Sequence, residues 1–148
     1  MSLRSFLDSM EKQGQVLHIK DGVSTKHEIS SIMNAFPDGP VLFFEDVEGY
    51  PSKVVGNICN TREKITQALG VSPEGLYRKL RDALQSPKAP KIVDDGSVKE
   101  VSEAPKLFKV PVLTHFEKDA GAYITSGVIS ARRFDGKIEM SPSIGCRF

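Results

Sequence analysis

The sequence has no tryptophan and only two cysteines, Cys59 and Cys146, which form no C-x-x-C pair. No histidine lies close to either cysteine along the chain. This spacing argues against a zinc site built on cysteine and against a disulfide scaffold. We therefore expect two reduced thiols and a cytoplasmic location, because disulfides rarely persist in that compartment.

Long hydrophobic runs and a charge excess are absent as well. The longest apolar runs, Val41–Phe44 and Val110–Leu113, are far shorter than the roughly 20 residues of a membrane span. Lys and Arg (20) nearly balance Asp and Glu (19), and this balance gives no electrostatic reason to expect nucleic acid or an anionic membrane as partner. No glycine-rich phosphate-binding motif is present. With 148 residues, of which 39% are hydrophobic, the composition is typical of a globular protein of about one domain.

Helix and strand signals alternate up to about residue 105. Ser2 and Thr61 are typical helix N-caps, and Gly14 and Gly70 are suited to helix ends. Apolar spacing and turn signals predict helices at 3–10, 24–36, 62–69 and 73–85, and strands at 16–19, 41–47 and 53–58.

Short strand-like pieces are expected at 91–93 and 98–101. The pattern changes after residue 105, where helix signals stop, and we expect an extended stretch over 107–113 and a hairpin of 123–132 with 137–148 around Asp135-Gly136. A hairpin alone is only marginally stable. The sequence therefore predicts an α+β fold whose last part opens a β domain, and we expect the chain to be a piece of a longer protein.

One polar loop is rich in side chains that can bind a ligand or take part in catalysis. Residues 111–127 combine His, Glu, Lys, Asp, Thr and Ser around a glycine and two aromatic rings. Such a loop is either a ligand-facing surface or an ordinary connection. Glu45-Asp46 follows a predicted buried strand and is either a metal-binding or basic pair or a solvated strand end. The histidines are scattered, and we interpret each as structural or solvated: His18, His27 and His115.

Four segments, in order and covering nearly the whole chain, carry a resemblance to a known family: Leu3–Lys20, Gly39–Asn57, Thr61–Gly70 and Leu107–Val128. They resemble the N-terminal part of the UbiD family of decarboxylases, reversible carboxy-lyases that use prenylated FMN. The resemblance implies an N-terminal α/β domain with a mixed sheet (residues 1–105). It also implies that residues 106–148 are the incomplete start of a split β-barrel that binds the prenylated flavin.

The same resemblance implies a function that this chain carries only in part. The family's catalytic carboxylates and later metal ligands lie beyond residue 148, so no catalytic residue or metal ligand is assigned here and the chain alone is expected to be inactive. The complete enzyme would use prenylated FMN, Mn²⁺ and K⁺ on an aromatic or α,β-unsaturated carboxylic acid, and would be a homo-oligomer. The alternative is a stand-alone, non-catalytic module that assembles with a partner subunit supplying the rest of the barrel.

The cofactor-binding residues implied by the resemblance lie near the C-terminal end: Thr125, Gly145, Cys146 and Arg147. Arg147 matches the family's arginine, whose guanidinium can form a bidentate pair with a carboxylate or phosphate; the alternative from the residues alone is a rim salt bridge. The family also has a metal-binding Asn five residues before this arginine, where this chain has Pro142. Either Ser141 or Glu139 supplies the nearest oxygen, or this chain coordinates metal differently.

Overall fold

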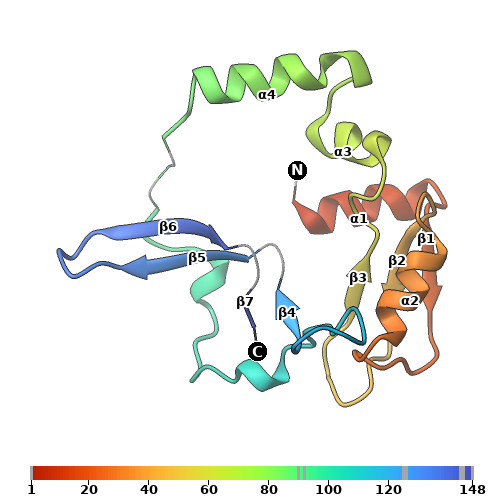
Figure 1. Cartoon of the computed structure of the whole chain (residues 1–148). Helices are drawn as coiled ribbons and strands as arrows, with labels where there is room; N and C mark the ends of the chain where they lie inside the picture. Colours follow the sequence, from red (N-terminus) through yellow and green to blue (C-terminus); the bar gives the residue numbers. More distant parts are fainter. Residues whose placement is uncertain (1, 90, 92, 125–126, 144–145, 148) are drawn as a thin grey trace.

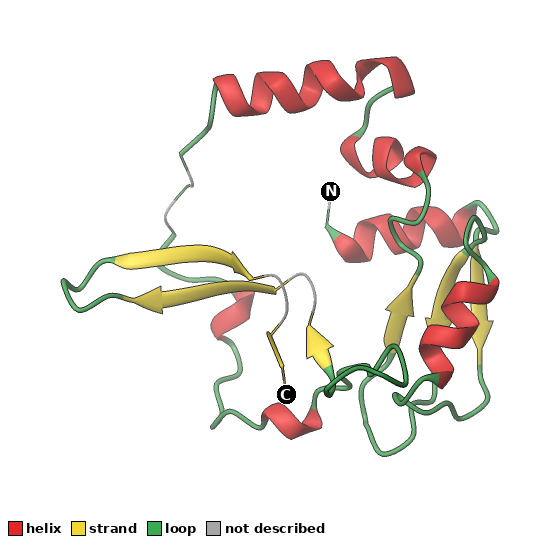
Figure 2. Ribbon diagram, in the orientation of Figure 1, coloured by secondary structure: helices red, strands yellow, loops and turns green. Residues whose placement is uncertain are grey.

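The computed structural model describes residues 2–89, 91, 93–124, 127–143 and 146–147, with only the backbone for residues 139–143 and 146–147. Four α-helices and seven strands occur in these residues (Figures 1 and 2). The helices are α1 (Leu3–Lys12), α2 (Glu28–Ala35), α3 (Arg62–Leu69) and α4 (Leu76–Gln85). The strands are β1 (Val16–Ile19), β2 (Val41–Phe44), β3 (Val54–Gly56), β4 (Tyr123–Ile124), β5 (Gly127–Arg132), β6 (Ile138–Ser143) and β7 (Cys146–Arg147). Three short 3-10 turns are η1 (Pro73–Gly75), η2 (Ser97–Lys99) and η3 (Leu107–Lys109).

Local signals at the helix ends agree with the structure. The Ser2 side chain accepts a hydrogen bond from the Ser5 amide at the start of α1. The Thr61 hydroxyl accepts one from the Lys64 amide, and Gly70 ends α3 in the left-handed region with φ 63°. Hydroxyl caps satisfy amides that have no partner inside the helix, and glycine adopts positive φ without a Cβ clash. The helices predicted at 3–10 and 62–69 are confirmed.

The first sheet is mixed, as expected, with the order β1-β2-β3. β1 runs parallel to β2, with Val16 opposite Val41, and β2 runs antiparallel to β3, with Leu42 opposite Gly56. The parallel pair requires a crossover connection, and α2 lies within it.

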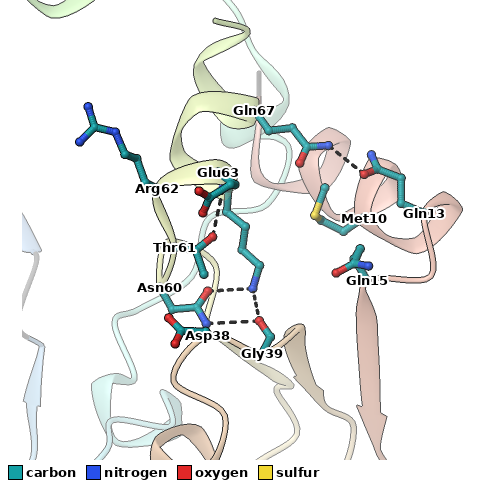
Figure 3. A pocket seen from close by; sticks show the side chains of 11 residues that line it. Met10, Gln13, Gln15, Asp38, Gly39, Asn60, Thr61, Arg62, Glu63 and Gln67 are labelled. Atoms are coloured by element: carbon teal, nitrogen blue, oxygen red, sulfur yellow. Dashed lines mark hydrogen bonds between the residues drawn. The ribbon is translucent and has the colours of Figure 1, made fainter. Parts of the chain in front are cut away.

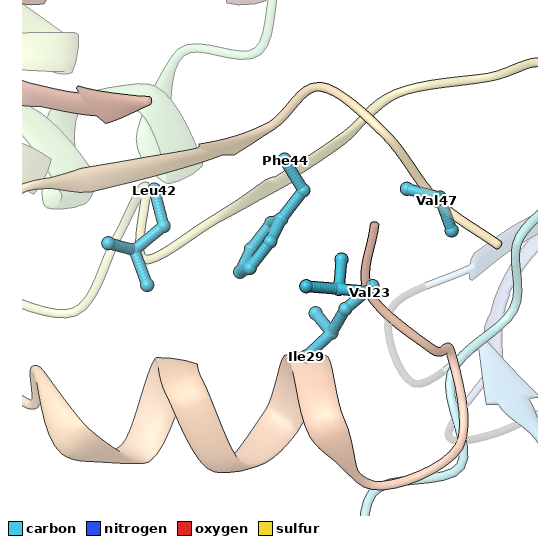
Figure 4. Packing of buried hydrophobic residues seen from close by; sticks show 5 residues of the cluster. All are labelled: Val23, Ile29, Leu42, Phe44 and Val47. Atoms are coloured by element: carbon cyan, nitrogen blue, oxygen red, sulfur yellow. The ribbon is translucent and has the colours of Figure 1, made fainter. Parts of the chain in front are cut away.

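The central strand β2 is covered on both faces. Leu42 and Phe44 point toward Ile29 of α2, together with Val23 and Val47 (Figure 4). Val41, the residue before Leu42, points to the opposite face of the sheet and packs with Phe6 and Met10 of α1. A continuous apolar run is what a strand needs when both of its faces are buried.

The structure corrects the predicted start of the second helix. α2 begins at Glu28, four residues after the expected Ser24. Val23 and Lys26 instead form β-bridges, with Val47 and Thr114, and the Ser24 amide donates to the Glu28 carboxylate. Since these backbone groups are paired outside the helix, they are not available to its first turn.

The strand predicted at 98–101 is wrong, because residues 97–99 form the 3-10 turn η2 and Val98 and Val101 are exposed. Residues 107–109 likewise form η3 rather than extended chain. A strand requires a neighbouring strand that completes its backbone hydrogen bonds. Among the described residues, no strand pairs with either of these two segments.

The C-terminal part contains two separate two-stranded sheets, β5–β6 and β4–β7. The β5–β6 hairpin turns at Asp135-Gly136 as predicted, with Gly136 at φ 82°. The described strands form no closed barrel, so the split β-barrel and the boundary at residue 105 stay predictions. No helix among the described residues combines the length and apolar character that crossing a bilayer requires.

Candidate functional site

The polar loop that the sequence points to borders an open cavity of about 310 Å³ lined by His115, Phe116, Asp119 and Tyr123. The Asp119 carboxylate shapes the loop, because its Oδ2 accepts hydrogen bonds from the backbone amides of His115 (3.2 Å) and Phe116 (2.9 Å). This arrangement closes a tight turn with an aspartate side chain. Sequence reasoning indicated the stretch, but it did not single out these four side chains.

The loop is fixed to the start of α2. The His27 amide donates to the Thr114 carbonyl at 2.9 Å, and the Thr114 amide donates to the Thr25 carbonyl at 3.1 Å. The Ser30 hydroxyl, which is buried, donates to the His115 carbonyl at 2.8 Å. Leu113 packs against the apolar cluster beneath α2. The cavity is therefore anchored to the start of α2 and to the apolar cluster beneath it.

Strand pairing brings the two ends of the C-terminal part together. In β4–β7, Tyr123 lies opposite Arg147 and Ile124 lies opposite Cys146. Directly opposite residues of an antiparallel pair have Cα atoms about 4.5–5.5 Å apart. Arg147 thus occupies a backbone position beside a residue that lines the cavity. Two other predicted cofactor-binding residues, Thr125 and Gly145, lie outside the described residues, and the cofactor role of all four stays a prediction.

A second, larger hollow of about 610 Å³ lies between the end of α1 and the start of α3 (Figure 3). Gln67 and Gln13 meet across it, with Nε2 donating to Oε1 at 3.1 Å. Lys64 is buried here, and its ammonium donates to the carbonyls of Gly39 and Asn57 and to Oδ1 of Asn60. An ammonium has three protons, so these acceptors use its whole donor capacity.

The Lys64 network has a structural role. Burial lowers the pKa of the Lys64 ammonium. The Asn60 amide donates to the carbonyls of Pro37 and Gly39, which lie just beyond α2. Asn57, at φ 56°, donates to the carbonyls of Met33 and Phe36 at the end of α2. The three polar side chains tie the loop after α2 to α3, and they leave no ammonium donor for a ligand in this hollow.

We expect Lys64→Met to destabilise the fold by about 2 kcal/mol, because it leaves buried carbonyl oxygens without their charged donor. The measurement is the free energy of unfolding in urea, with Lys109→Met as a control on an exposed lysine. Equal stability of the two variants would contradict the structural role.

His18 links two carboxylates from distant segments. Its Nε2 lies 2.6 Å from Oε1 of Glu11 in α1, and its Nδ1 lies 2.7 Å from Oε1 of Glu45 after β2. These hydrogen bonds raise the pKa of His18 above 6.5, with the Glu11 bond contributing most. The bond to His18 lowers the pKa of Glu45, assisted by the charge of Lys53. The Glu45 carboxylate is therefore hydrogen-bonded to His18. When protonated, His18 forms ion pairs with both Glu11 and Glu45.

The sign of the pH dependence follows from these two shifts. The raised pKa of His18 adds stability that is complete below pH 6.5 and is lost as pH rises through the folded pKa. The lowered pKa of Glu45 adds stability above pH 4.5 that is lost as pH falls through its folded value. We expect the urea concentration at the midpoint of unfolding to decrease as pH rises from 6.5 through the folded pKa of His18, and His18→Gln to reduce this decrease. An unchanged pH profile in His18→Gln would refute the assignment.

Cys59 is an exposed, free thiol. Among the described residues, no three His, Cys, Asp or Glu side chains are arranged to hold a metal ion.

Two family models match the chain in sequence order. The N-terminal domain of 3-octaprenyl-4-hydroxybenzoate carboxy-lyase matches residues 7–84, which is more than half of the chain. The Rift-related domain of the same carboxy-lyase matches residues 91–143. The chain belongs to the UbiD family.

Relatives and solved structures agree with this assignment. The UbiD-family chain is 33% identical to the anhydromevalonate phosphate decarboxylase of Methanosarcina mazei over 129 residues, covering 87% of this chain and 30% of that protein. It is 36% identical to the enzyme of the same name from Methanocaldococcus jannaschii over 114 residues, covering 75% and 26%. The chain thus spans about 30% of the length of these curated relatives.

The fold also matches a solved UbiD-class enzyme. The evolved dimeric form of HmfF from Pelotomaculum thermopropionicum, in complex with prFMN, superposes with a TM-score of 0.83 at 33% identity. The match covers 95% of this chain and 34% of that one. Helices, mixed sheet and C-terminal strands are therefore arranged as in one third of a larger UbiD-class enzyme.

Proposed function

We propose that this chain forms the N-terminal part of a prenylated-FMN-dependent, non-oxidative decarboxylase. The observation that carries the proposal is the superposition of 95% of the chain on a UbiD-class enzyme whose structure contains prFMN. The curated relatives, which are decarboxylases by name, support the same reaction class. The proposed substrates are aromatic or α,β-unsaturated carboxylic acids.

The hollow beside β4 would receive one edge of the flavin. Phe116 and Tyr123 offer aromatic surfaces for a planar ring system, while His115 adds a polar group. Its volume of about 310 Å³ is at the lower end of the range for ligand sites, so this chain supplies one wall of the site. Mn²⁺ and K⁺, which we also propose for the complete enzyme, would take ligands from elsewhere in it.

The flavin, when bound, would supply the electron sink that makes loss of carbon dioxide feasible. The residues of this chain would orient the flavin and the substrate. Arg147, whose backbone lies opposite Tyr123 in the strand pair, would hold a carboxylate or phosphate through its guanidinium fork. The anchored loop around Asp119 would keep this wall rigid, because its backbone amides are already bonded.

The test begins with the intact mass of the native protein and continues with the enzyme's activity. A mass several times 16.3 kDa is expected. The native polypeptide, loaded with prenylated FMN, should then release carbon dioxide from one of a panel of aromatic and α,β-unsaturated acids. Absence of flavin binding and of turnover across the panel would overturn the proposal. A native mass near 16.3 kDa would instead direct the search to a partner subunit.

A further inference from the structure

The buried hydroxyl of Ser30 joins two segments that are far apart in the sequence. Ser30 lies in the first turn of α2 and is 3% exposed. Its hydroxyl lies 2.8 Å from the carbonyl oxygens of both His27 and His115, so one proton is shared between two acceptors. Among the described residues, the His115 carbonyl receives no other hydrogen bond, whereas the His27 carbonyl also accepts from the amide and the hydroxyl of Ser31. The Ser30 hydroxyl therefore matters more to His115 than to its own helix.

The backbone of His27 is adapted to the same contact. Its φ of 69° lies in the left-handed region, which is unfavourable for a residue with a Cβ atom. The His27 side chain makes no capping hydrogen bond to α2, but its amide donates to the Thr114 carbonyl at 2.9 Å. Strained backbone conformations persist where surrounding bonds hold them, and they cluster at ligand sites. The start of α2 is thus shaped by its contact with the loop.

Backbone hydrogen bonds extend this contact to the predicted cofactor-binding strand. The Thr114 amide donates to the Thr25 carbonyl at 3.1 Å, and the Tyr123 amide donates to the Leu113 carbonyl at 3.2 Å. Tyr123 in turn lies opposite Arg147 in the β4–β7 pair. In Figure 1 the loop lies between α2 and β4, and β7 lies beyond β4. A displacement of the loop relative to α2 would therefore also displace the backbones of Tyr123 and Arg147.

We propose that Ser30 is a positioning residue for the cavity wall. By holding the His115 carbonyl, it sets where His115 and Tyr123 face the flavin. This inference rests on the proposed function, which places the flavin against that cavity. The cavity is lined by residues of the loop and of β4 and not by Ser30, so Ser30 acts only through the loop.

The experiment replaces Ser30 with alanine in the full-length polypeptide. Ser30→Ala should raise the hydrogen-exchange rates of the Thr114 and Tyr123 amides about tenfold or more, because the loop loses its buried donor. These rates are compared with that of the Val41 amide in β2, which separates local opening of the loop from a general loss of stability.

Two functional measurements accompany the exchange. The dissociation constant for FMN, measured by quenching of flavin fluorescence in the apo polypeptide, should rise about tenfold in Ser30→Ala. The value of kcat/KM for decarboxylation by the enzyme loaded with prenylated FMN should fall by about tenfold or more, because a displaced wall misaligns the flavin and the substrate.

The neighbouring Ser31 provides a matched control. Ser31→Ala makes the same chemical change in the same turn of α2, but the hydroxyl that it removes is exposed and bonded to His27. Loop exchange, FMN affinity and kcat/KM in this variant should stay close to those of the unaltered polypeptide.

Two results would overturn the inference. One is equal loop exchange in Ser30→Ala and Ser31→Ala. The other is faster exchange in Ser30→Ala with unchanged FMN affinity and kcat/KM, because the residue would then have a purely structural role. An unaltered polypeptide that binds neither FMN nor prenylated FMN would refute the proposed function and with it the role of Ser30 at a flavin. The exchange difference needs no flavin, so it distinguishes that failure from absence of the Ser30 contact.

Discussion

Replacing Arg147 with alanine in the full-length enzyme should lower kcat/KM for decarboxylation by at least about a hundredfold while the fold is retained. The residue lies opposite Tyr123 in the β4–β7 pair, beside the cavity that we propose as one wall of the flavin site. A guanidinium there would pair with a carboxylate or phosphate through two parallel hydrogen bonds, and alanine offers none.

The control for this experiment is Arg132→Ala, which removes an exposed arginine from β5. Its turnover should match that of the unaltered enzyme. Arg147→Lys should recover only part of the activity, because an ammonium keeps the charge but not the planar fork. Flavin absorbance and the thermal unfolding temperature are measured in all variants. Full turnover in Arg147→Ala would remove the residue from the proposed site.

Replacing Phe44 with alanine should destabilise the fold by about 3–5 kcal/mol. Its ring is fully buried between the sheet and α2, in contact with the cluster that contains Ile29 and Leu42 (Figure 4). Removing it loses the burial of the ring and leaves a cavity that the surrounding residues fill only in part. The free energy of unfolding in urea measures the effect.

The neighbouring Phe43 provides a matched control with the same chemical change. It lies on the other face of β2, is only half-buried, and contacts His18 and Lys53 near the surface. Phe43→Ala should therefore cost clearly less than Phe44→Ala. Equal costs would mean that the alternation of β2 side chains between its two faces is wrong.

The sequence was most informative where a structural feature depends on neighbouring residues. Helix α3 was predicted at both ends, because Thr61 and Gly70 act on backbone groups within one turn. The hairpin at Asp135-Gly136 depends in the same way on a local turn. The mixed sheet and the start of α2 depend on distant partners. Bridges to Val47 and Thr114 displaced the helix start, and no nearby residue indicates them.

The candidate site shows the same division. The stretch 111–127 stood out by composition, yet the role of Asp119 in shaping the loop depends on the backbone path. The pairing of Tyr123 with Arg147 joins residues that only strand register brings together. His18 looked like an isolated histidine because its partners Glu11 and Glu45 lie 7 and 27 residues away along the chain. The chemical character of these side chains could be predicted from the sequence, but which of them lie close together in the fold could not.

The two-faced burial of β2 has a consequence for how the strands find their alignment during folding. Shifting β2 by one residue would exchange Leu42 and Phe44 for Val41 and Phe43, so hydrophobicity on either face penalises the error only weakly. The bond between His18 and Glu45 forms only when β1 and β2 are aligned as observed, since a one-residue slip would move the Glu45 carboxylate to the opposite face. This polar contact at the sheet edge therefore selects the correct alignment among otherwise similar apolar pairings.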